Sequence, residues 1–227
     1  MFDLNFTTER LISILLTIPA VLLSLSVHEF AHGWMSYKLG DPTARNLGRL
    51  TLNPIKHIDP IGFLCMIFFN FGWAKPVPVM ARYYKKPRRD MALVAAAGPI
   101  SNLLLCLIGV LLTHISGFVF RLIPDPSATA YQFMNVWWLF LLQFSILNAS
   151  LAVFNLIPIP PLDGSRIAFI FLPPKFYFGV MRYERYIQIA LFILIFAGAF
   201  DFALSACVDG IMNGLYFLVE LIPIFKP

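Results

Sequence analysis

Long apolar stretches with very few charges constrain this chain more than any other feature of its sequence. The first covers residues 11–37, whose first 17 residues hold no charge, and others lie at about 91–115, 133–157 and 186–204. At ~1.5 Å of rise per residue, 20–25 helical residues can cross the ~30 Å hydrocarbon layer of a bilayer. Only 13% of the residues are charged, too few to cover a soluble domain of this length. The sequence predicts an all-α membrane protein, a polytopic helical bundle of about four to six spans.

The C-terminal stretch is less clear. Residues 206–225 are apolar but carry Asp209 and Glu220, so they could form a further span or a helix at the membrane interface. Neither an internal repeat nor a polar linker divides the chain. We therefore expect residues 1–227 to form a single intramembrane domain.

The region between the first two spans has a different character. Residues 41–90 mix prolines and glycines with residues favourable to strands, and the stretches 49–52 and 76–79 alternate like short edge strands. We expect a small membrane-associated β region here.

Basic residues gather in two loops. Ten of the 17 Lys and Arg residues fall within 38–89 and four within 158–185, whereas the N-terminal tail has only Arg10. Cytoplasmic loops of membrane proteins carry an excess of Lys and Arg, so both loops should be cytoplasmic and the N-terminus extracytoplasmic. Because the larger basic region lies between two apolar segments, topology explains it better than nucleic-acid binding does. We expect a multi-pass protein of the cell membrane with no nucleic-acid partner.

The first span contains the sequence HEFAH, in which His28 and His32 flank Glu29. Four residues make about one helical turn, so both imidazoles project from one face and can bind the same metal ion. The glutamate between them is placed to take a proton from a water on that metal. Ionisable residues inside a membrane helix are unfavourable and usually functional. A purely structural role, with the histidines capping a helix at the interface, is the weaker interpretation.

A catalytic zinc needs a third protein ligand besides two histidines. His114 is expected on the opposite face of the membrane and His57 in the basic loop, so neither is a good candidate. Asp163 is better placed, because it follows the prolines that end the third span on the same face as the HExxH motif. Gly164 permits a turn there that could aim the carboxylate inward.

Several motifs, taken in order, resemble the site-2 proteases, a family of intramembrane zinc metalloproteases. They are HEFAH in the first span, GWAKPVPV at 72–79, AAGPISN at 96–102 and NLIPIPPLDG at 155–164. The chain is similar to the compact members, which lack a PDZ or a cystathionine-synthase-like domain.

This resemblance implies that His28, His32 and Asp163 bind one Zn²⁺ and that Glu29 is the general base. It also implies that Asn102 lies close to the zinc. The expected activity is a zinc metalloendopeptidase that cleaves membrane protein substrates within or near their transmembrane segments, as in regulated intramembrane proteolysis.

Asn102 and Asn155 are candidates for contacts with substrate or the developing oxyanion. Asn102 could instead be interhelical glue, and Asn155 could merely satisfy the end of a broken helix. Residues 72–79 could hold an extended substrate strand. The oligomeric state is left open.

Two other classes of function use similar residues. A metal transporter could carry the same His and Asp cluster, but transporters usually show polar residues through several helices and inverted repeats. An inactive scaffold would be a natural interpretation if Glu29 were replaced, but it is present.

Overall fold

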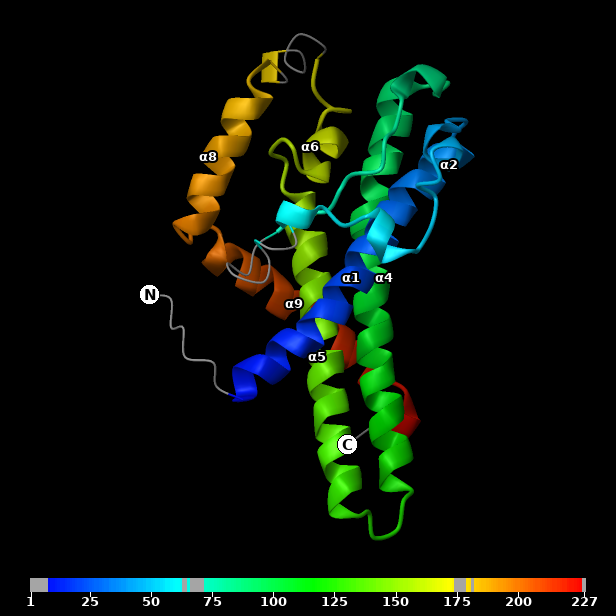
Figure 1. Ribbon diagram of the computed structural model, residues 1–227, viewed down its shortest axis with the longest axis vertical. Coiled ribbons are helices and arrows are strands. Elements are labelled where there is room, and N and C mark those ends of the chain that lie inside the picture. The colour runs from blue at the N-terminus through cyan, green and yellow to red at the C-terminus, as the bar shows by residue number, and fades with distance from the viewer. Residues whose placement is uncertain (1–7, 63–64, 66–71, 174–178, 181, 226–227) are drawn as a thin grey trace.

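The structure is a computed structural model that describes residues 8–62, 65, 72–173, 179–180 and 182–225. Four long helices dominate the protein (Figure 1). They are α1 (Thr8–Lys38), α4 (Pro87–Arg121), α5 (Ala128–Leu156) and α9 (Asp201–Glu220). Within the described residues, these four are long and apolar enough to cross a membrane. The expected multi-pass helical membrane protein is confirmed at this level.

Shorter helical elements connect the long ones. They are α2 (Thr43–Asn46), η1 (Pro54–Lys56), η2 (Ala81–Tyr83), α6 (Asp163–Ala168), α8 (Glu184–Phe196) and η3 (Pro223–Phe225).

The prediction of a span at 186–204 is wrong. Helix α8 has 13 residues, about 20 Å of helix, which is too short to cross the hydrocarbon layer. It ends because Gly198 adopts a left-handed conformation with φ of +71°. The N–H groups of Gly198 and Ala199 bond back to the carbonyls of Ile195 and Leu194, which is a Schellman motif. The following helix, α9, contains most of the stretch 206–225 that the sequence left undecided.

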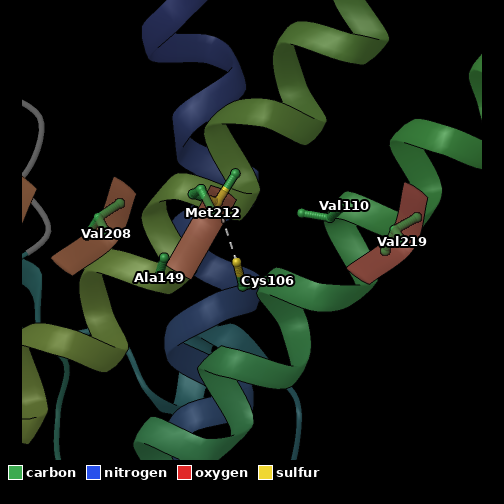
Figure 2. Close-up of a cluster of buried hydrophobic side chains, with 6 residues drawn as sticks. All are labelled: Cys106, Val110, Ala149, Val208, Met212 and Val219. Atoms are coloured by element: carbon green, nitrogen blue, oxygen red, sulfur yellow. Dashed lines mark hydrogen bonds between the residues drawn. The ribbon is translucent and has the colours of Figure 1, made fainter. Parts of the chain in front are cut away.

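Helix α4 is the centre of the bundle and packs against α1, α5, α6 and α9. Its contact with α5 is close because Gly109 has no side chain: a Cβ at that position would collide with the Ser145 hydroxyl. Small residues allow such close approach between membrane helices. Figure 2 shows α9 completing this packing, with a buried cluster drawn from α4, α5 and α9, namely Cys106, Val110, Ala149, Val208, Met212 and Val219.

The prediction of a β region within 41–90 is not supported. Among the described residues of this region, the only β feature is an isolated bridge between Ile58 and Ala74. The physical reason lies in the 74–80 segment, where Pro76 and Pro78 have no N–H to donate to a neighbouring strand.

Side chains bind the backbone of the 74–80 segment instead. The N–H of Val77 donates to Glu29 Oε2 at 2.7 Å, and the N–H of Met80 donates to Asp41 Oδ2 at 2.7 Å. Arg49 Nη2 donates to the carbonyl of Lys75 at 2.7 Å. These hydrogen bonds hold the segment in an extended conformation against α1.

Candidate metal centre

Three side chains that are far apart in the sequence converge inside the bundle. His28 and His32, on successive turns of α1, have their Nε2 atoms 3.0 Å apart. Asp163, the first residue of α6, places Oδ2 3.2 Å from each of those nitrogens. Both histidines are buried, with exposed fractions of 5% and 9%. Of the residues that the structure describes, these three form the group able to hold a metal ion.

A tight turn brings Asp163 to the two histidines. Helix α5 ends at Leu156, and the chain then reverses through proline-rich residues before α6 begins. Gly164 packs so closely on the carbonyls of Leu156 and Ile157 that a Cβ there would collide with them. The glycine therefore permits the close approach that carries the carboxylate into the bundle.

Hydrogen bonds to Nδ1 set the orientation of both imidazole rings. His32 Nδ1 lies 2.7 Å from the carbonyl oxygen of Val94, and His28 Nδ1 lies 2.5 Å from Asn102 Oδ1. Both partners are acceptors, so each Nδ1 carries the hydrogen. In the neutral rings the lone pairs are then on the two Nε2 atoms that face each other, as metal-ligating histidines require.

The three ligand atoms fit a metal ion. Atoms bound at ~2.0–2.1 Å to a tetrahedral zinc lie about 3.3 Å apart, close to the observed 3.0–3.2 Å. Asp163 Oδ2 is buried, and no protein group forms a hydrogen bond with it. A cation would satisfy the carboxylate and both lone pairs together.

Gly98, on α4, provides space beside the ligands. A Cβ at this position would lie 2.5 Å from His32 Nε2 and 2.6 Å from His28 Nε2. Any other residue type would therefore intrude on the two Nε2 atoms that would face a metal ion. This glycine belongs to the AAGPISN sequence, and its presence inside a long helix is the signal that could have marked it.

The surroundings of Asp163 favour the ionised form of its carboxyl group, which is the form that binds a metal ion. Burial alone would raise the pKa of this carboxyl group, but the two imidazoles facing it outweigh burial and hold the pKa well below its usual range. The group is thus ionised before a metal arrives.

Glu29 is placed beside this group but is not part of it. It follows His28 directly on α1, it is 9% exposed, and its Oε2 accepts the hydrogen bond from Val77. The backbone of the 74–80 segment thereby fixes the direction of the carboxylate. Val77 in turn lies over Gly33, whose missing side chain makes room for it.

The two predicted asparagines lie in different surroundings. Asn102 is fully buried, and both ends of its amide are engaged: Oδ1 by His28 and Nδ2 by Asn148. Asn155 is half-buried and donates to the carbonyl of Leu151 in its own helix. The structure thus brings Asn102 to the candidate metal centre as the hydrogen-bond partner of His28, and the described contacts of Asn155 include none with that centre.

Sequence reasoning missed two groups of the site besides Gly98. The carbonyl of Val94 carries no sequence signal at all, because any residue could supply it. The second missed group, the side chain of Asn148, could have been found from the sequence, because a polar amide in an otherwise apolar span is unfavourable without a partner.

Fold and site together define a multi-pass membrane protein whose bundle encloses a group of two histidines and one carboxylate able to hold a metal ion, with a glutamate alongside. The chain belongs to Peptidase family M50, whose family model matches residues 16–198. The resemblance to the site-2 proteases is thereby confirmed.

Relatives of known name agree with this family. The chain is 42% identical over 175 residues to a protein of Bacillus subtilis (strain 168) named "Putative zinc metalloprotease YwhC", covering 77% of each chain. It is 32% identical over 154 residues to "Putative zinc metalloprotease Rip2" of Mycolicibacterium smegmatis, covering 66% of this chain and 54% of that protein. No solved structure matches the chain.

Proposed function

We propose that this protein is an intramembrane zinc endopeptidase that cleaves membrane proteins within or near their transmembrane segments. The observation that carries the proposal is the convergence of His28, His32 and Asp163 within a bundle of apolar helices, with Glu29 held beside them. The family and the names of the relatives supply the zinc and the peptidase class.

His28, His32 and Asp163 would hold the zinc. When bound, zinc lowers the pKa of a coordinated water to about 7 and polarises the carbonyl of the bond to be cleaved. The protein's own contribution is a rigid ligand set, because both rings are tied at Nδ1 and Asp163 is tied by the turn at Gly164.

Glu29 is the general base in this proposal. Its Oε2 is occupied by the N–H of Val77, which leaves Oε1 to take the proton of the attacking water. The same carboxyl group can then return that proton to the leaving amine. A base that is already held by a backbone N–H loses little orientational freedom on reaching the transition state.

The site is proposed to open toward the cytoplasm. Lys38 ends α1 six residues after His32, and α4 begins within the basic sequence that precedes Val94. The positive-inside tendency then places the N-terminus outside and the metal near the cytoplasmic boundary, where water can reach it. In Figure 1, α2, α6 and the first turns of α4 lie toward the upper part of the molecule, and the α4–α5 connection lies at the opposite end.

Substrates in this proposal are transmembrane proteins. Their segments would enter sideways from the lipid, unwind, and be held extended beside residues 72–79. This part of the chain already lies against α1, and its backbone is bound by Glu29 and Arg49. The next residue, Met80, is bound by Asp41.

Co-expression with candidate single-span membrane proteins tests the proposal. Wild type should cut within or close to the transmembrane segment, with the site mapped by mass spectrometry, and Glu29→Gln should abolish the cut while zinc stays bound. A metal transporter would retain much of its transport in that variant. Cysteine labelling at Lys86 should report the cytoplasm, and labelling from outside would overturn the orientation.

A further inference from the structure

A second buried asparagine, Asn148 of α5, lies behind the ligand partner Asn102. Asn102 Nδ2 donates to Asn148 Oδ1 at 2.8 Å. Asn148 Nδ2 donates to Ser24 Oγ of α1 at 2.9 Å and to the carbonyl of Phe144 at 2.8 Å. Asn102, Asn148 and Ser24 are each 0% exposed, so no bulk water can replace any of these bonds.

The partners of Asn148 allow its amide only one orientation. A backbone carbonyl can only accept, so the NH₂ end of Asn148 must face Phe144. Ser24 gives its own hydroxyl proton to the carbonyl of Ala20 at 2.7 Å, and it too is an acceptor toward Asn148. Both hydrogens of the NH₂ group are thus used, and the oxygen of Asn148 must face Asn102.

This orientation is passed on to the metal centre. Because Asn148 presents an oxygen, Asn102 must turn its NH₂ end toward it and its own oxygen toward His28. His28 then has to carry its hydrogen on Nδ1, which leaves the Nε2 lone pair facing His32 and Asp163. A flipped Asn102 amide would place two donors against each other at His28 and two acceptors against each other at Asn148.

We propose that Asn148 is a positioning residue for the metal centre, which sets the tautomer of His28 through the amide of Asn102. This inference rests on the proposed function, in which His28 is a zinc ligand. A mere link between helices would need only some hydrogen bond between α4 and α5. Here every donor and acceptor from the Phe144 carbonyl to His28 Nδ1 is matched in one direction, and the last atom reached is the metal ligand.

The test is zinc affinity of the full-length protein in detergent, measured by competition with a chromophoric chelator. Asn148→Leu and Asn148→Ser should each weaken zinc binding about 10–100-fold, the range typical for loss of an outer partner of a metal ligand. The serine variant guards against misfolding, because its hydroxyl can bond to the carbonyl of Phe144 as Ser145 does to Leu141. It is too short to replace the oxygen that faces Asn102.

Ser145→Ala is the matched control. Ser145 lies one turn earlier on the same helix, is buried and bonds only within α5, so its loss should leave zinc affinity unchanged. A folded Asn148 variant that binds zinc as tightly as this control overturns the inference.

Repeating the Asn148 substitution in an Asn102→Asp variant distinguishes a positioning role of Asn148 from a packing role. In Asn102→Asp both side-chain oxygens accept, so either can hold His28 Nδ1, and replacing Asn148 by serine should no longer weaken zinc binding. An equal loss in both backgrounds would show that Asn148 acts through packing, which overturns the inference. Zinc-free wild type, or full zinc affinity in His28→Ala, would instead refute the proposed function.

Discussion

Replacing Gly98 by alanine would put a methyl group into the space that the two histidines share. The added Cβ would lie 2.5 Å from His28 Cε1 and His32 Nε2. Ordinary van der Waals contact begins near 3.4 Å, so the rings would have to retreat by about 0.9 Å. Metal–ligand distances tolerate about 0.2 Å. Both rings are also tied at Nδ1, to Asn102 and Val94, and cannot swing aside without breaking those bonds.

We therefore expect Gly98→Ala to lose zinc while keeping its helical fold. Alanine favours a helix over glycine by ~0.5–1 kcal/mol, so the backbone of α4 gives no reason to unfold. The measurement is zinc content by mass spectrometry after gel filtration, together with thermal unfolding followed by circular dichroism.

Gly214→Ala is the matched control for this substitution. Gly214 lies inside α9, and a Cβ there would have nothing within 4 Å. This variant should bind zinc as wild type does, and its free energy of unfolding should rise by up to about 1 kcal/mol. If Gly98→Ala also held one zinc with wild-type affinity, the assignment of the space beside Gly98 to the metal would be refuted.

Three further substitutions probe other parts of the site. Asp163→Ala should lose zinc, because two histidines alone do not complete a catalytic site, and atomic absorption showing full occupancy would contradict the ligand assignment. Val77→Pro removes the N–H that holds Glu29 and should lower kcat about 10-fold or more at unchanged zinc content, measured on a substrate found by co-expression. Burial raises the pKa of Asp41, but hydrogen bonds, chiefly those from Thr43, outweigh burial and lower it. Asp41 therefore stabilises the folded protein fully at pH values above the pKa of the carboxyl group in the unfolded chain, about 3.9. This stabilisation is lost as the pH falls through the lower pKa of the folded protein. The melting temperature of wild type should fall over that acidic range. Asp41→Asn should melt at a lower temperature than wild type at pH 7, and its melting temperature should fall less on acidification. Equal pH dependence of the two melting temperatures would contradict this reasoning.

The sequence alone was sufficient for the class of protein and for the three candidate ligands that the structure brings together. Apolar stretches of 20 or more residues admit few structures other than helices in a bilayer, so the first three spans followed from composition. The spacing of His28 and His32 followed from helical periodicity. Asp163 could be proposed because two histidines leave a catalytic zinc one ligand short and because prolines mark the helix end before it.

The sequence did not show where a helix ends within an apolar stretch, because this depends on the backbone conformation. Residues 186–204 are apolar throughout most of their length, and composition favoured one span. The structure ends α8 at Phe196, because Gly198 takes up a left-handed conformation and bonds back to the helix. A glycine permits that conformation but does not require it, so the sequence could not decide between a span and a turn.

Tertiary contacts decided the rest of the site. The alternating residues at 76–79 resemble a strand, but the backbone of 75–80 is bound by the side chains of Glu29, Asp41 and Arg49, which are distant in sequence. The orientation of the Asn102 amide likewise depends on Asn148 in another helix. Periodicity reports which face of an element is apolar, whereas the direction of a buried hydrogen bond is set by whichever donor or acceptor the packed helices bring opposite it.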